Sequence, residues 1–286
     1  GLYFINSTGS DPNKPTQIWT QGETEANSCW FPTIDSPNQK TSQEIYITVP
    51  KKFKTLSNGI LVSQENSGSN RTDYWKFDQK HAPYLIFMGV GEYEVIEDSY
   101  KNIPVNYYVE KKYASVAKDI FGQTPEMIGF FEDRLGVAYP WAKYSQIVAR
   151  EYVSGAMENT TAVVHGDDAY QMKGQLIDEN RQENTIAHEI FHHWFGNLVT
   201  SESWSNLALN ESFANYSQYL WREYKYGKTD ADAHLFENIK AYKDDTDNYE
   251  KKSLKLLCKM HIKFVILQRF LDNNSTKNTY VKRHPN

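Results

Sequence analysis

Residues 185–197 of the chain read TIAHEIFHHWFGN, and this stretch decides the fold that we expect. His188 and His192 are four positions apart, so on an α-helix they stand one turn apart on the same face, close enough to share one metal ion. Glu189 lies about 60° around the helix from His192, where its carboxylate can reach a metal-bound water without ligating the metal. The spacing therefore predicts a helix that carries two metal ligands and a general base.

A third ligand is expected outside this stretch. H-E-x-x-H is the pattern of zinc metallopeptidases, in which a catalytic zinc usually has three protein ligands and leaves a fourth position to water. Glu211, which eighteen residues separate from His192, is predicted to supply the third ligand. His193 is not predicted as a ligand, because it lies off the face that His188 and His192 share.

The composition is that of a globular, acidic chain. Its 286 residues are 40% hydrophobic and 14% aromatic, which is ample for a buried core. A net charge of -5 without a sustained basic run predicts no nucleic-acid partner, whereas an acidic protein suits a positively charged substrate. No stretch approaches the roughly 20 continuous apolar residues of a membrane span, so we predict none.

The cysteines and the first residue say little about the compartment. Two cysteines, Cys29 and Cys258, make no disulfide framework. The chain begins with Gly1, and no charged and then apolar segment opens it as in a signal peptide. We therefore expect a clipped or partial piece of a longer protein, whose localisation stays unknown.

The predicted secondary structure changes along the chain from strands to helices. Residues 43–49 alternate in hydrophobicity, residues 85–88 are a short apolar run, and residues 105–109 are rich in tyrosine and valine, so we expect an antiparallel β region up to about residue 109. Helical signals begin near Lys112. The helices that we expect are residues 124–135, with Thr124 as N-cap, Pro125 as first helical residue and Gly136 past the end; residues 178–197, with an apolar back that includes Leu198; and residues 206–224.

Two motifs carry a resemblance to a known family. The zinc motif followed by Glu211 within residues 209–214, LNESFA, resembles the gluzincin aminopeptidases of the aminopeptidase N type. Upstream, residues 155–159, GAMEN, match a second signature of that family. The resemblance runs from about Gly1 to about Tyr249 and fails after that.

The resemblance implies an α+β fold in three parts. Residues 1–109 would be the C-terminal part of the family's β-rich N-terminal domain, antiparallel in structure. Residues 110–250 would form a thermolysin-like, mainly helical zinc metallopeptidase domain. Residues 251–286 would be an atypical or truncated tail. Its basic amphipathic part, residues 251–269, is interpreted as a plain surface helix or an aberrant terminus, with a membrane surface or a partner groove as the alternative.

The GAMEN segment and an early loop are the predicted substrate-binding residues. A predicted strand over residues 145–153 leads into the GAMEN segment. An exposed edge strand beside a metal site can pair with an extended peptide. Glycine and alanine allow that close approach, and a methionine is expected to pack. A buried carboxylate needs a cationic partner, which the resemblance identifies as the free α-amino group of the peptide. The resemblance also places a glutamine and a glutamate of the early loop in the pocket, although they can equally be ordinary polar loop residues. These residues are Gly155, Ala156, Met157, Glu158, Gln21 and Glu23.

The predicted reaction is hydrolysis of the first peptide bond of peptides with a free N-terminus, with one zinc ion held by His188, His192 and Glu211 and with Glu189 as the base. The resemblance also implies a catalytic tyrosine in a Tyr-x-Lys-Gly context, roughly sixty to seventy residues after the third ligand. No such match occurs, and Tyr280 has only half of the motif. One alternative is therefore a catalytically impaired zinc-binding fragment or pseudoenzyme. A second alternative is a relative that hydrolyses epoxides, because it would share all the motifs.

Overall fold

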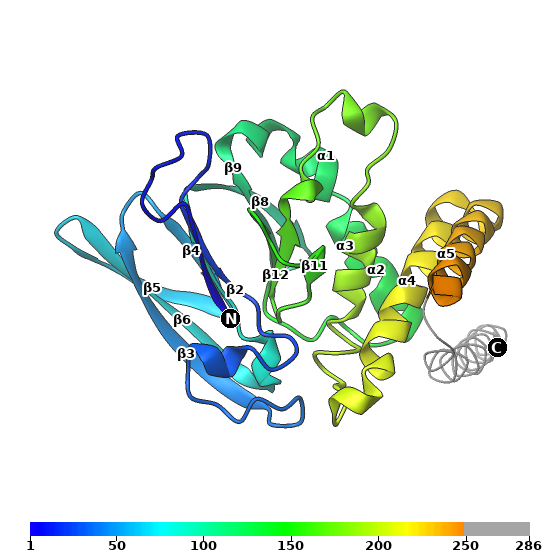
Figure 1. The fold of residues 1–286 in the computed structure, drawn as a ribbon, viewed down its shortest axis with the longest axis horizontal. Coiled ribbons are helices and arrows are strands. Elements are labelled where there is room, and N and C mark those ends of the chain that lie inside the picture. Colours follow the sequence, from blue (N-terminus) through cyan, green and yellow to red (C-terminus); the bar gives the residue numbers. More distant parts are fainter. Residues whose placement is uncertain (249–286) are drawn as a thin grey trace, which may run out of the picture. The chain divides into compact units, whose positions relative to one another are not determined.

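The computed structural model describes residues 1–248 and shows a mixed α+β chain, with antiparallel sheets first and a helical region after them, as predicted (Figure 1). Contacts divide the chain into two compact units, Gly1–Ala214 and Asn215–Asn286. The first unit holds all the strands of the described part and every site residue discussed below. The predicted tail, including Tyr280, lies outside the described residues.

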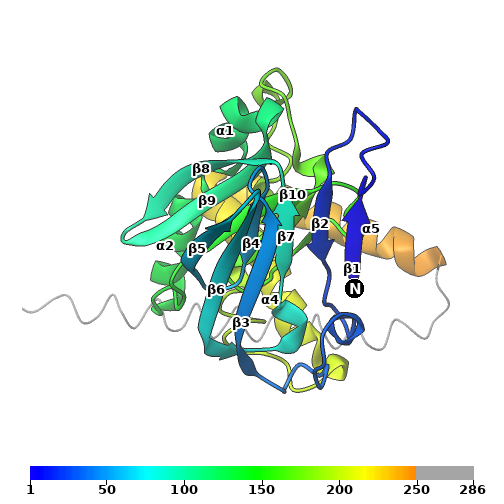
Figure 2. The same cartoon turned by 90° about the vertical axis from the view of Figure 1, so that its left-hand side faces the viewer.

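Two antiparallel sheets open the chain. Their strands alternate between buried and exposed positions, as in β3, where Ile47 and Val49 are buried while Tyr46 and Thr48 face outward. Figure 2 looks onto these sheets, with β3 and β6 in front. In order across the sheets, the four-stranded one comprises β1 (Leu2–Ile5), β2 (Gln17–Thr20), β7 (Met88–Gly91) and β4 (Lys54–Ser57), and the three-stranded one β3 (Thr41–Pro50), β6 (Asn70–His81) and β5 (Ile60–Ser67).

A five-stranded mixed sheet forms the middle of the first unit. β10 pairs in parallel with both β9 and β12, and all six of its residues are buried, as expected for a strand covered on both faces. β11 is an edge strand, antiparallel to β12. The domain boundary predicted at residue 109 stays a prediction, and it falls within this sheet. In order, the strands are β11 (Ala156–Met157), β12 (Ala162–Gly166), β10 (Tyr144–Ala149), β9 (Ile103–Glu110) and β8 (Tyr93–Tyr100).

The helices of the first unit cover the face of the mixed sheet that points away from the N-terminal sheets (Figure 1). The α-helices of residues 1–248 are α1 (Ala117–Phe121), α2 (Thr124–Leu135), α3 (Glu183–Phe191), α4 (Ala208–Tyr226) and α5 (Lys228–Asn248). α4 runs from the first unit into the second, and α5 belongs to the second unit. Short 3₁₀ turns are η1 (Asn27–Cys29), η2 (Pro83–Leu85), η3 (Lys111–Val116), η4 (Asp167–Ala169), η5 (Gln175–Ile177) and η6 (Trp204–Asn206).

The predicted helix ends were partly wrong. Gly136 ends α2 in a left-handed conformation (φ 66°), as predicted. Thr124 is not the N-cap but the first residue of α2, because its hydroxyl donates back to the carbonyl of Phe121 (2.6 Å) instead of capping forward. α3 is shorter than residues 178–197, since the side chain of Asn180 bonds the carbonyl of Ile120 and the amide of Gln182 and so competes with a helical turn.

The core joins all three sheets. Large side chains that are almost completely buried fill it, among them Trp19, Leu56, Tyr84, Phe87 and Ile147. α3 adds the predicted apolar back, in which Ile186, Ile190 and Phe191 are buried and Phe191 packs edge-on against Phe131 (5.1 Å between centroids). Leu198, predicted to share that back, is 40% exposed because the helix has ended before it.

The second unit is described up to residue 248. Ion pairs between Arg222 and Asp230 (2.6 Å) and between Lys228 and Asp232 (2.8 Å) join the end of α4 to the start of α5. Within residues 1–248, no helix combines the length and the apolar character that crossing a membrane requires.

Candidate metal centre

Three side chains converge on one point: His188 in α3, His192 directly after the end of α3, and Glu211 in α4. The Nε2 atoms of His188 and His192 are 2.9 Å apart, and the carboxylate oxygens of Glu211 lie 3.4 Å and 3.6 Å from them. Ligand atoms at about 2.1 Å from a tetrahedral zinc would be separated by about 3.4 Å. The separations of the three pairs bracket this value, and the donor set of two imidazoles and one carboxylate is one that zinc takes. The residues therefore fit a metal ion.

The turn after α3 orients one of the imidazoles. Nδ1 of His192 donates to the carbonyl of Phe195 (3.0 Å), so that Nε2 carries a lone pair and faces the other two ligands. The chain reverses at Gly196, whose φ of 127° suits glycine. A Cβ there would lie 3.0 Å from Nδ1 of His192. Glycine at this position thus leaves room for the ligand ring.

Glu189 lies beside the ligands with an oxygen that nothing in the described chain bonds. Its side chain is buried, and Oε2 has no hydrogen-bond partner among residues 1–248. Burial, and then the nearby carboxylates of Glu158 and Glu211, raise its pKa well above the usual value. A buried carboxylate oxygen without a partner is costly, so this atom marks a place where a proton donor or a cation belongs.

Glu158 approaches the same point from the sheet. One carboxylate oxygen each of Glu158 and Glu189 and a ring nitrogen of His192 lie within 4.8 Å of one another. Burial and the charge of Glu211 raise the pKa of Glu158 to about 8. Glu211 differs: burial raises its pKa, but the bond to His188 and the two imidazoles outweigh burial and hold it below the usual value. Several carboxylates thus share a small buried volume, which favours cationic partners.

The two early-loop residues lie close to the GAMEN segment. Nε2 of Gln21 is 3.4 Å from Sδ of Met157, and the hydroxyl of Tyr152 donates to its Oε1. Burial, followed by the charges of Glu158 and Glu211, raises the pKa of Glu23 to about 8. Both residues therefore lie close to the GAMEN segment, while their role stays a prediction.

The other GAMEN residues behave as expected of an edge strand. Gly155 is exposed, and a Cβ built on it meets nothing within 4 Å. Ala156 is half-buried, and Met157 belongs to the core, which agrees with packing rather than chemistry. The edge of β11 beside Glu158 thus offers backbone groups for pairing with an extended chain.

Tyr84 is a neighbour of the site that the sequence reading missed. It is 1% exposed, its hydroxyl lies 3.4 Å from Oε1 of Glu158, and it accepts a bond from Nδ2 of Asn210 (3.1 Å), the residue before Glu211. It therefore connects the carboxylate of the sheet to the helix of the third ligand. A tyrosine within an apolar run reads as core, so no local signal identifies it.

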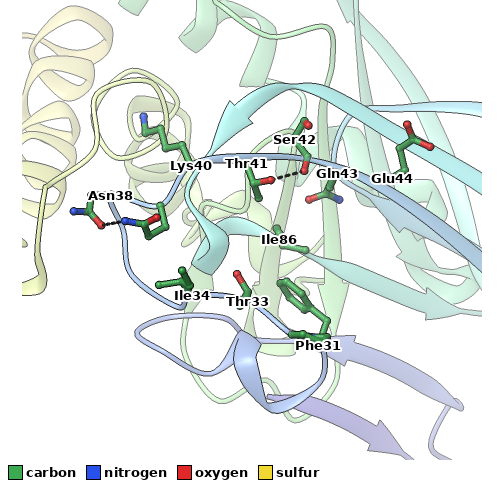
Figure 3. A pocket seen from close by; sticks show the side chains of 12 residues that line it. Phe31, Thr33, Ile34, Asn38, Lys40, Thr41, Ser42, Gln43, Glu44 and Ile86 are labelled. Atoms are coloured by element: carbon green, nitrogen blue, oxygen red, sulfur yellow. Dashed lines mark hydrogen bonds between the residues drawn. The ribbon is translucent and has the colours of Figure 1, made fainter.

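A groove of about 540 Å³ lies nearby along the start of β3 (Figure 3). Figure 3 shows Phe31 and Ile34 on one side of it and Thr41 to Glu44 on the other. None of the predicted site residues lines it. The lining residues are Phe31, Pro32, Thr33, Ile34, Asn38, Gln39, Lys40, Thr41, Ser42, Gln43, Glu44 and Ile86.

Comparisons with known proteins extend over both parts of the chain. It is 33% identical to glutamyl aminopeptidase of Bos taurus over 199 residues, which are 66% of this chain and 20% of the relative. It is 32% identical to tricorn protease-interacting factor F2 of Thermoplasma volcanium over 227 residues, 77% of this chain and 27% of the relative. With probable aminopeptidase 1 of Saccharolobus solfataricus it shares 29% over 235 residues, 80% of this chain and 30% of the relative.

The chain thus spans between a fifth and three tenths of the length of these curated relatives. The Peptidase M1 N-terminal domain matches residues 1–85, and the Peptidase family M1 domain matches residues 120–272. The second match alone covers more than half of the chain and contains all three converging side chains. The predicted end of the resemblance near Tyr249 was wrong, because the family match continues to residue 272. The resemblance inferred from the two motifs is confirmed, and the chain belongs to peptidase family M1.

Proposed function

We propose that this protein is a zinc-dependent aminopeptidase that hydrolyses the N-terminal peptide bond of peptides. The observation that carries the proposal is the convergence of His188, His192 and Glu211 within 4.8 Å, next to a buried carboxylate with a free oxygen. Membership of a peptidase family and relatives named aminopeptidases support it.

The three converging side chains would hold one zinc ion. When bound, zinc polarises the scissile carbonyl and lowers the pKa of a water toward neutrality. Glu189 accepts the proton of the attacking water at its free Oε2 and passes it to the leaving amine. Burial suits this task, because it raises the pKa of Glu189 and so makes the protonated state accessible near neutral pH.

Glu158 and Glu23 would bind the amino terminus of the substrate. Both carboxyls have a pKa of about 8 because they are buried next to other acids, and a substrate ammonium would restore their charged form. The edge of β11 would pair with the first residues of the peptide. Anchoring the chain end in this way fixes how far the scissile bond lies from it, which distinguishes an aminopeptidase from a general peptidase.

The test compares a peptide with a free amino terminus and the same peptide N-acetylated. The zinc-loaded chain should cleave the free peptide at its first bond at least about tenfold faster, because acetylation removes the charge that the acids bind. Mass spectrometry of the products identifies the bond. Cleavage that is equally fast with both peptides, or that occurs inside the chain, would contradict the proposal.

A second candidate is a catalytically impaired zinc-binding protein. Residues 1–286 contain no Tyr-x-Lys-Gly match to supply the hydrogen-bond donor that the resemblance implies. Loss of one hydrogen-bond donor to the oxyanion costs on the order of 10² to 10³ in rate in comparable sites, while zinc binding survives. One zinc per chain without hydrolysis of either peptide would favour this candidate. Hydrolysis of an epoxide lipid would favour the alternative that the protein is an epoxide-hydrolysing relative.

A further inference from the structure

His193, the residue after a predicted metal ligand, bonds two elements of the site at once. Its ring is completely buried. Nε2 accepts a hydrogen bond from the backbone amide of Thr161 (3.1 Å), and Nδ1 lies 3.0 Å from the carbonyl of Glu189. The ring therefore lies between α3 and the segment that follows Glu158.

The two bonds define the tautomer. A backbone amide only donates, so Nε2 must be the unprotonated nitrogen and Nδ1 must carry the proton that goes to the carbonyl of Glu189. Both nitrogens are thereby engaged away from the metal ligands. The indole of Trp141 donates to the backbone carbonyl of His193 (3.0 Å). The ring of Tyr144 packs against the imidazole of His193 (4.9 Å between centroids), so the imidazole has little freedom to rotate.

Thr161 is held firmly on its other side. It has φ of 66°, which a β-branched residue rarely adopts. Its hydroxyl accepts from the amide of Gly59 (2.8 Å) and from Nζ of Lys143 (3.0 Å), and the buried lysine also donates to the carbonyls of Ser57 and Thr161. A strained residue that persists in this way is fixed by its surroundings. Thr161 is thus a rigid point of attachment three residues after Glu158.

We infer that His193 is a positioning residue for the recognition of the substrate's amino terminus: its bond to the amide of Thr161 sets where the carboxylate of Glu158 lies relative to Glu189. The inference rests on the proposed function, because its first test measures how the substrate's amino terminus is bound. One side of the bridge holds the backbone of Glu189 and the other holds the segment that carries Glu158, so the imidazole fixes the spacing between base and amine-binding acid.

Three substitutions of His193 separate the two bonds. Glutamine places its amide oxygen near the position of Nε2 and can accept from Thr161, whereas asparagine places its amide near Nδ1 and can reach only Glu189. Leucine makes neither bond. The matched control is His165→Leu, which removes an equally buried imidazole that, within residues 1–248, bonds only the side chain of Gln146 (2.9 Å).

The first measurement is calorimetric binding of a free peptide whose first peptide bond is replaced by a non-hydrolysable one, and of its N-acetylated form, to the zinc-loaded full chain, with metal analysis of each variant. We expect His193→Leu and His193→Asn to reduce the preference for the free peptide by about tenfold through weaker binding of that peptide alone, with one zinc per chain retained. His193→Gln should stay within about twofold of the native preference. His165→Leu should lower Tm and leave the preference for the free peptide at the native value. If the loss of any buried ring were enough to reduce that preference, His165→Leu would reduce it as well.

The second measurement is amide hydrogen exchange at residues 158–161, which does not depend on any ligand. Exchange there should quicken by at least about tenfold in His193→Leu and His193→Asn, but not in His193→Gln. If the native chain shows no preference for the free peptide, the proposed function fails and the exchange pattern alone judges the bridge. The inference would be overturned if His193→Leu left either the exchange or the preference for the free peptide unchanged. It would also be overturned if the glutamine and leucine variants lost that preference equally.

Discussion

Two buried carboxylates of this molecule have opposite surroundings. Asp73 in β6 is 1% exposed and accepts bonds from Arg71, Thr55 and Gln64, so that these bonds outweigh burial and its pKa lies below the usual value. Glu189 in α3 is 5% exposed, has an oxygen without a partner within the described chain, and has a raised pKa. Burial is the same in kind, yet one acid is satisfied by the fold and the other is not. The contrast separates a structural acid from one that awaits a ligand.

The largest expected effect is a loss of turnover on substitution of Glu189, the unsatisfied acid. Replacing it with glutamine keeps the shape but removes the base, so turnover of a free peptide should fall by on the order of 10³-fold. Metal analysis should still find one zinc per chain, because Glu189 is not among the three ligands. Unchanged turnover with full zinc would remove Glu189 as the base.

The corresponding substitution at the satisfied acid is Asp73→Asn. It leaves the buried guanidinium of Arg71 without a charged partner, and we expect the free energy of unfolding to fall by about 3 kcal/mol in chemical denaturation. Zinc affinity and the preference for free peptides should not change. A loss of zinc binding at unchanged stability would show that the two acids are not distinct in role.

Buried histidines sharpen the comparison through pH. Burial lowers the pKa of His81 and of His165 to about 3, and both are neutral in the folded chain. The unfolded chain protonates them near pH 6.5, so it binds more protons and stability is lost as the pH falls from 6.5 toward 3. Each ring contributes about 1.4 kcal/mol per pH unit in this range. Relative to the native chain, His165→Leu should therefore lose about 1 kcal/mol of this dependence when the metal-free chains are denatured at pH 6.5 and 5.5, since half of the unfolded imidazoles are already protonated at pH 6.5. The same pH dependence in both chains would contradict the neutral assignment of His165.

The smallest effect concerns Tyr84, whose hydroxyl lies 3.4 Å from Oε1 of Glu158, a neighbour of the unsatisfied Glu189. Tyr84→Phe removes the hydroxyl that lies near Glu158 and accepts from Asn210. We expect the preference for the free over the N-acetylated peptide to fall by about fivefold, which corresponds to one net hydrogen bond. Tyr139→Phe is the control, since its buried hydroxyl bonds the carbonyl of Lys143 instead. Equal effects in the two variants would place Tyr84 in the core alone.

The sequence sufficed where geometry is local. Two histidines four positions apart must share a helix face, and the structure brings both together with Glu211. The sequence did not reveal that β9 pairs in parallel with β10, because such pairing joins segments that a stretch of helices separates. His193 and Tyr84 were missed for the same reason: each acts through a partner more than 30 residues away. The N-cap at Thr124 failed on a competing bond of its hydroxyl, which propensity does not show.

β11 is only two residues long, and this brevity limits what the edge can do. An added strand finds backbone partners for about two residues and then none, so a long peptide gains nothing over a short one by lying there. A brief edge also gives other unfolded chains little to zip onto, which keeps an open sheet margin from becoming a nucleus for aggregation.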